Sequence, residues 1–128
     1  MAKFMLIGLC EPPDDASEAA FKEWFLDEHI EDTARCPGFV KSQVFRLAGP
    51  HLDIDTPARY LSLYEVEAES YEAAERLIND WQADPKAWEG RGKHWATASK
   101  FDAIPLRVGG SGWYELLAAY DEAGERTE

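Results

Sequence analysis

One histidine stands among aromatic and acidic residues in a stretch that is typical of a helix. His29 follows Trp24 and Phe25 closely, and Asp32 comes three residues later. Aromatic and carboxylate neighbours shift the pKa of an imidazole, which suits histidine to proton transfer near neutral pH. We therefore take His29 as the candidate general acid or base. The competing interpretation is an ordinary histidine at a seam between a helix and a sheet.

Two acidic residues belong to the same part of this helix. Asp32 is three residues after His29 and four after Glu28, so the carboxylates and the imidazole share one side. Either carboxylate could orient the ring and stabilise its charged form after it accepts a proton. Acids in such positions more often form a solvated surface. Asp32 is the preferred partner of His29.

Tyrosines and tryptophans further along the chain could complete a site. Tyr60 and Tyr64 would share one face of a strand, and a phenol directed into an apolar cleft can donate a hydrogen bond to a substrate oxygen. Core packing is the competing explanation. We expect Tyr64, in the middle of the strand, to be a catalytic partner. The expected substrate contacts are aromatic residues and a second histidine: Trp24, Phe25, Tyr60, Trp81, Trp88 and His94.

Motifs for metals and nucleotides do not occur in the sequence. It contains no His-x-His, Glu-x-x-His or Cys-x-x-Cys spacing, and no Gly-x-Gly-x-x-Gly. The glycine-rich run at 109–112 lacks the lysine of a phosphate-binding loop. We expect neither a metal nor another cofactor.

The elements that would position these residues alternate between strands and helices. Apolar runs predict four strands, and capping residues at Asp15 (with Glu18 three later) and Ser70 begin two helices. The order is βαββαβ, which gives an α+β, ferredoxin-like antiparallel sheet with helices on one face. The predicted strands are 3–10, 39–47, 59–68 and 97–108. The first helix is 15–35, the second runs from Ser70 through Trp81, and a short helical turn starts at Asp84-Pro85.

The expected domain ends at residue 108. Residues 109–112 predict a flexible hinge, 113–120 a short helix that completes a C-terminal extension, and 121–128 a disordered acidic tail. The strands carry apolar residues on both faces, so we expect a second sheet to cover the face without helices. A symmetric homodimer supplies that sheet.

Charge and cysteine content limit the partners and the cellular location that we expect for the protein. The net charge of −12 disfavours nucleic acid and anionic membranes as partners. Cys10 and Cys36 form no disulfide framework, so we expect two free thiols and a cytoplasmic location. The apolar run 4–10 is too short to span a membrane, and no cleavage site follows it.

Three segments resemble the dimeric α/β-barrel superfamily, closest to its EthD-like and small cyclase-like members. They are Trp24-x-x-x-x-His29, the turn Pro37-Gly38-Phe39, and the run Tyr60 to Glu65, and the resemblance covers residues 3 to 105. It implies a dimeric α/β barrel with a cleft for aromatic or polyketide-like molecules in each subunit. Relatives of this kind include cofactor-free cyclases, dehydratases, decarboxylases and isomerases, as well as monooxygenases and haem-degrading enzymes.

Three functions are compatible with these observations. The first is a cofactor-independent lyase that uses His29 on an aromatic or polyketide-like substrate. The second is a small monooxygenase of the same superfamily, dependent on haem or free of cofactors. The third is a non-catalytic module that binds hydrophobic ligands. Fold alone does not separate them.

Overall fold

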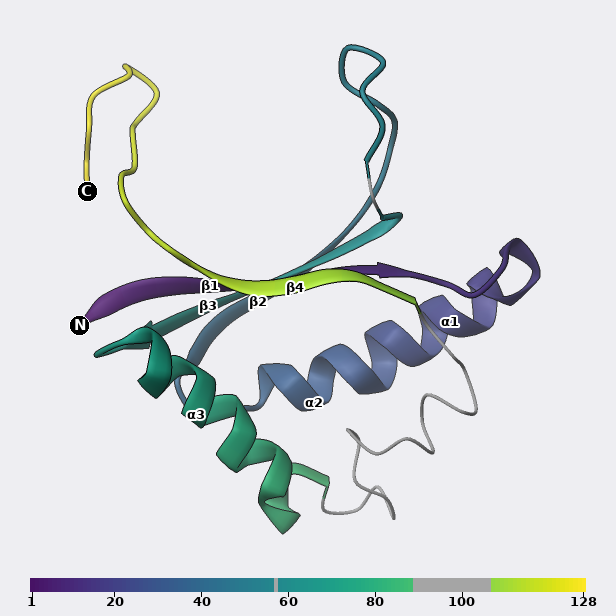
Figure 1. Cartoon of the computed structure of the whole chain (residues 1–128), viewed down its shortest axis with the longest axis horizontal. Coiled ribbons are helices and arrows are strands. Elements are labelled where there is room, and N and C mark those ends of the chain that lie inside the picture. The colour runs from purple at the N-terminus through teal and green to yellow at the C-terminus, as the bar shows by residue number, and fades with distance from the viewer. Residues whose placement is uncertain (57, 89–106) are drawn as a thin grey trace.

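A four-stranded antiparallel sheet with helices on one side forms the body of the chain (Figure 1). The computed structural model describes residues 1–56, 58–88 and 107–128. The strands are β1 (Ala2–Glu11), β2 (Phe39–Arg46), β3 (Tyr60–Ala68) and β4 (Arg107–Glu115), in the spatial order β2-β3-β1-β4. The predicted α+β, ferredoxin-like fold is therefore confirmed.

The helical segments lie together beneath the sheet in the view of Figure 1. After β1 come a 3-10 turn (Asp15–Ser17), α1 (Glu18–Trp24), a π-helical turn (Phe25–His29) and α2 (Ile30–Ala34). After β3 come α3 (Tyr71–Ala83) and a 3-10 turn (Pro85–Trp88). Within the described ranges, no helix is both long enough and apolar enough to cross a membrane.

Local capping explains where the helices begin and end. Ser70 caps α3 as predicted, because its Oγ accepts a hydrogen bond from the Ala73 amide at 3.1 Å. The first helical stretch is capped one residue earlier than predicted: Asp14, not Asp15, accepts from the Ser17 amide at 2.8 Å. Gly38 has a φ of +92° in the turn after α2, and a Cβ there would approach a Leu77 methyl to 2.9 Å. A glycine is therefore required at this turn.

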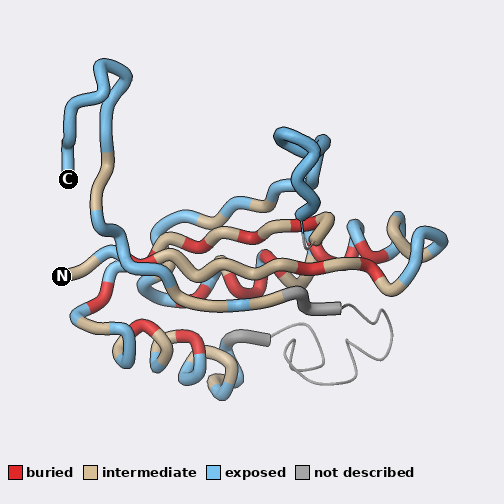
Figure 2. Tube along the Cα trace, turned by 45° about the horizontal axis from the view of Figure 1, so that its top comes forward, coloured by how far each residue is buried: buried red, intermediate tan, exposed pale blue. Residues whose placement is uncertain are grey.

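The core lies between the sheet and the helices. Alternate residues of β3 are buried on this side, whereas Leu61 and Leu63 between them are only half-buried (Figure 2). The largest cluster joins the first helical stretch to the strands through Cys10, Phe21, Trp24, Phe25, Ile30, Tyr60 and Tyr64.

Apolar residues at spacings of three and four predict an inner stripe for α3, made of Tyr71, Ala74, Leu77, Ile78 and Trp81. The prediction is correct except at the first residue. Ala74 and Ile78 are buried, and Leu77 and Trp81 are half-buried. Tyr71 was expected inside but is exposed. It is the first residue of α3, directly after the capping residue Ser70.

The predictions of a hinge at 109–112 and a helix at 113–120 are wrong. These glycines and Trp113 belong to β4, which pairs with β1 so that Leu6 lies opposite Trp113 and Ile7 opposite Gly112. A short apolar run does not distinguish a strand from a helix by its period, and the free edge of β1 decides for the strand. The predicted strand segment 97–106 lies outside the described residues.

Residues 121–128, for which the sequence predicts a disordered tail, form hydrogen-bonded turns in the structure. The Asp121 side chain accepts hydrogen bonds from the Ala123 and Glu125 amides, at 3.0 and 2.9 Å. The Thr127 amide donates to the Ala119 carbonyl at 2.7 Å. Asp and its following amides form a turn that the sequence reasoning overlooked.

Candidate active site

His29 is the last residue of the π-helical turn. The Ile30 amide donates to the carbonyl of Phe25, five residues earlier, instead of the usual four. The Thr33 hydroxyl donates to the His29 carbonyl at 3.2 Å, a local bond that commonly accompanies bends in helices. Turns of this kind occur frequently at functional sites.

The π-helical turn places the imidazole on aromatic rings. In a regular α-helix, residues five apart point about 140° away from each other. Here the His29 ring stacks on Trp24, with centroids 5.0 Å apart and 28° between the planes, and it lies 5.5 Å from the Phe25 ring. The residue is half-buried, and its Nδ1 atom is shielded from solvent. One side of the imidazole is thereby fixed by aromatic contacts.

Asp32 is buried rather than part of a solvated surface. Its residue exposure is 0%, and its Oδ1 accepts a hydrogen bond from Arg35 Nη2 at 3.1 Å. Its backbone carbonyl accepts from Trp81 Nε1 at 2.8 Å, and the Arg35 guanidinium lies over the Trp81 ring, 5.8 Å from its centroid. Trp81 therefore secures the end of α2, and this contact accounts for its position without a ligand.

Tyr64 lies deep on the helix side of β3. Burial raises the pKa of its phenol above the usual range, and the hydroxyls of Thr33 and Ser62 partly oppose that shift. The phenol is therefore protonated at neutral pH and can act as a hydrogen-bond donor. The Ser62 hydroxyl also donates to the Gly8 carbonyl at 3.5 Å, and a Cβ at Gly8 would approach that hydroxyl to 2.7 Å.

Tyr60 shares the face of Tyr64, as predicted, but its hydroxyl has a structural partner. The hydroxyl donates to Glu18 Oε1 at 3.0 Å. Two effects raise the pKa of the phenol: burial, which is the larger, and this hydrogen bond. Tyr60 therefore contributes its ring to the cluster while its polar end holds α1 against β3.

Glu18 is the centre of a charged network that the sequence reasoning missed. Its carboxylate accepts from Arg46 at 2.9 and 3.0 Å and from Arg59 at 2.8 Å. These bonds lower the pKa of Glu18, and the bond from Arg46 has the largest effect. Arg59 also binds Asp15 at 2.9 Å. The partners are 28 to 44 residues apart in the sequence, so local spacing carries no signal for the network.

The structure gathers some predicted site residues and separates others. Trp24, Phe25, Tyr60 and Tyr64 belong to one buried cluster, and His29 stacks on its edge. Trp81 packs against a different cluster, with Cys36 and Ile78. The remaining two predicted contacts, His94 and the side chain of Trp88, lie outside the described residues.

The two cysteines are free, as predicted, and both are buried. Burial raises the pKa of the Cys10 thiol to about 11 and that of Cys36 to about 12. Both are therefore protonated at neutral pH and poorly suited to nucleophilic attack. Among the described residues, no group of three or more histidine, cysteine or acidic side chains is arranged to hold a metal ion.

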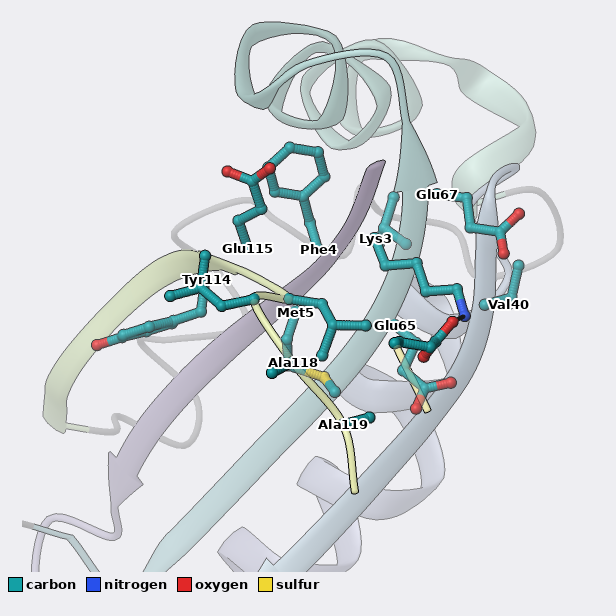
Figure 3. A pocket seen from close by; sticks show the side chains of 14 residues that line it. Lys3, Phe4, Met5, Val40, Glu65, Glu67, Tyr114, Glu115, Ala118 and Ala119 are labelled. Carbon is teal, nitrogen blue, oxygen red and sulfur yellow. Dashed lines mark hydrogen bonds and ion pairs between the residues drawn. The ribbon is translucent and has the colours of Figure 1, made fainter. Parts of the chain in front are cut away.

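A cavity of about 710 Å³ lies on the opposite face of the sheet, where the C-terminal segment leaves β4 (Figure 3). Its walls include Met5, Val40, Glu65 and Tyr114, and His29 does not line it. His29 and the buried aromatic cluster are therefore on one face of the sheet, and this cavity is on the other.

Three solved structures share this fold. HapK from Hahella chejuensis is 16% identical, with a TM-score of 0.58 over 94% of this chain and 99% of that one. An EthD-family protein from Bacillus halodurans is 18% identical, with a TM-score of 0.55 over 91% and 100%. A protein from Shewanella loihica, provisionally named a monooxygenase, is 17% identical, with a TM-score of 0.51 over 91% and 95%.

No family model and no curated protein matches the sequence. The structural likeness covers nearly the full length of both chains in each comparison. It defines the class of the chain as a ferredoxin-like α+β protein. In particular, the chain has the fold seen in HapK and the EthD-family structure, so the resemblance drawn from the sequence is confirmed at the level of the fold.

Proposed function

We propose that this chain is an enzyme in which His29 transfers a proton to or from an aromatic or polyketide-like substrate. The reaction would be a cofactor-independent dehydration, decarboxylation or ring closure. The observation that carries the proposal is the π-helical turn that stacks His29 on Trp24 beside a buried aromatic cluster. The likeness to the EthD-family structure and to the Shewanella protein supports an enzyme but does not select a lyase.

The neighbouring residues are assigned roles from their position in the chain, their burial and their hydrogen bonds. His29 would accept the proton, and the buried Asp32 carboxylate, one turn later, would favour the imidazolium that results. Tyr64, whose phenol stays protonated because burial raises its pKa, would donate to the developing oxyanion. Tyr60 is assigned a positioning role, since its hydroxyl already donates to Glu18.

The working unit in this proposal is a homodimer that covers the open face of the sheet. We define the open face as the side without helices, where β1 and β3 present Met5, Ile7, Leu9, Leu61 and Leu63. All five are only half-buried. A second copy packed face to face would remove this apolar surface from water.

The decisive experiment compares two histidines. Product formation from a panel of phenolic acids and polyketide-like compounds would be followed by mass spectrometry for loss of water or carbon dioxide. With an active substrate, His29→Gln should lower kcat/KM by about 10² to 10⁴. His51→Gln is the matched control, because His51 lies exposed in the loop after β2 and should keep full activity. A His29→Gln enzyme as active as wild type would refute the assignment.

A monooxygenase is the second candidate, favoured by the name of the Shewanella structure. It would require molecular oxygen, whereas a lyase would not. Turnover in anaerobic buffer separates the two, and a Soret band in the purified protein would indicate haem. Oxygen consumption in step with product formation would replace the lyase proposal by this one.

A further inference from the structure

The segment after β4 is a structured arm. We define the C-terminal arm as residues 116–128. In Figure 1 it rises from the sheet on the side away from the helices. Its own hydrogen bonds hold its shape: Arg126 Nη2 donates to the Leu117 carbonyl at 3.2 Å, and Thr127 pairs with Ala119. Glu128 forms an ion pair with Lys3 of β1, which ties the tip of the chain back to the sheet.

The arm exposes its large apolar side chains although its backbone is tied down. Leu117 is 82% exposed and Tyr120 65% exposed. The loop after β2 rises on the same side of the sheet and exposes Leu52 and Ile54 (Figure 2). All the large exposed apolar residues of the described chain except Met1, Leu26 and Tyr71 lie on the open face, the arm or this loop. A concentration of this kind marks an interaction surface.

The arm also encloses a space above the sheet. The 710 Å³ cavity lies between the arm and the ends of β1, β3 and β4. Met5 forms part of its floor, and Tyr114, Leu116 and Leu117 line the side of β4 and the arm. An apolar side chain from a docked surface could contact the carbon atoms of these residues. Charged side chains line the rest of the cavity, namely Lys3, Glu65, Glu67, Glu115 and Glu128.

The area of the open face can be compared with the area that a stable dimer needs. Strands of eight to ten residues are about 30 Å long, and four of them are about 19 Å wide, so the flat face measures about 600 Å². A stable interface buries about 800 Å² on each partner. The footprint of the sheet is thus of the order that a stable dimer needs, and the arm adds exposed apolar surface to it.

We propose that the C-terminal arm is a clasp for a second copy of this chain, with Leu117 and Tyr120 as its contacts and the cavity beneath it as the receiving space. This inference rests on the proposed face-to-face homodimer. A second copy is the occupant that fits, because the arm continues the same apolar face that the dimer would cover. A two-fold axis gives each subunit both an arm and a face to be held.

The test measures the dimer dissociation constant of the full-length chain by sedimentation velocity over a range of protein concentrations. Leu117→Asp and Tyr120→Asp should each weaken the dimer at least tenfold, since each places a charge in the contact. Tyr71→Asp is the matched control: Tyr71 is similarly exposed, but it lies on α3, on the other side of the sheet, and the dimer should be unchanged. Circular dichroism verifies that each variant is folded.

A fourth variant, Leu63→Asp, probes the open face itself and separates the two proposals. If Leu63→Asp dissociates the dimer while both arm variants leave it intact, the homodimer stands and the clasp is refuted. If the wild-type chain is monomeric at every concentration, both fail. Such a monomer would then be tested with the apolar dye 1-anilinonaphthalene-8-sulfonate. If the wild-type monomer binds the dye and Leu117→Asp does not, the cavity beside the arm is a small-molecule site.

Hydrogen exchange gives an independent measurement. Amides of residues 116–120 should exchange more slowly when the protein concentration is raised across the dissociation constant, because the docked partner shields them. Exchange in the arm that does not depend on concentration would overturn the clasp.

Discussion

The two faces of the sheet differ in how deeply they bury neighbouring residues of the same strand. On the helix side of β3, Tyr60 and Tyr64 are buried and their hydroxyls lie beside polar partners. On the open face, Leu61 and Leu63 are only half-buried. The difference separates two tasks: the helix side supplies the interior and the candidate chemistry, and the open face is left for assembly. Paired substitutions, one on each face, test this separation.

The largest difference is expected from apolar truncations. Phe21→Ala removes a ring with 0% exposure that stacks on Phe25 and meets Tyr60 edge-on, and should lower the free energy of unfolding by about 3 to 5 kcal/mol. Leu63→Ala should cost about 1 kcal/mol in the monomer, because the side chain is already half in water. Urea unfolding at low protein concentration measures both. Equal costs would mean that the open face is as well packed as the core.

Ion pairs should show the same contrast at a smaller scale. Asp32→Ala removes a buried carboxylate that binds Arg35 and should cost about 2 to 4 kcal/mol. Lys3→Met breaks the exposed pair with Glu128 and should leave stability unchanged within error. Thermal unfolding by circular dichroism is sufficient for this comparison. A stable Asp32→Ala protein would show that the buried pair is dispensable for folding.

Two tyrosine hydroxyls offer a finer comparison. Tyr60→Phe deletes the bond to the Glu18 carboxylate, and the free energy of unfolding should fall by about 1 to 2 kcal/mol. Tyr114→Phe makes the same change on an exposed ring beside the cavity and should have no measurable effect. Chemical denaturation detects the difference. An equal effect of both substitutions would argue that the Tyr60 hydrogen bond contributes nothing net.

The smallest change, counted per pH unit, is a dependence on alkaline pH that belongs to the helix side. Burial raises the pKa of the Cys10 thiol from 9.0 to about 11, so between these values the unfolded chain loses a proton that the folded chain keeps. Stability should therefore fall as the pH rises from 9 to 11, by about 1 kcal/mol per pH unit from this group. Unfolding at several pH values should give a shallower slope for Cys10→Val than for wild type. Identical slopes would contradict the burial effect.

Predictions from the sequence succeeded where a signal was local and periodic. Ser70 and the apolar spacing that follows it located α3, and the apolar run from residue 59 to 68 located β3, although apolar residues on both faces did not tell which face is buried. The prediction failed for Trp113, because a short apolar run after glycines fits a helix or a strand equally and only the free edge of β1 decides.

The candidate site was accessible to sequence reasoning only in part. His29 and its aromatic neighbours stood out by residue type, and the structure places Trp24 and Phe25 against the ring. The partners of Glu18 did not stand out, since Arg46 and Arg59 come from distant segments. The burial of Asp32 was missed as well, because its spacing alone fits a solvated surface.

The π-helical turn has a consequence for recognising relatives of this chain. A turn with a bond between residues 25 and 30 is equivalent to one residue inserted into an ordinary helix. A homologue that lost one residue between Trp24 and His29 would regain regular geometry, with tryptophan and histidine four apart and still on one side. What evolution can preserve at this position is therefore the stacking of two rings, while the number of residues between them is free to change by one. Searches that require Trp-x-x-x-x-His would overlook proteins in which the rings of Trp-x-x-x-His stack in the same way.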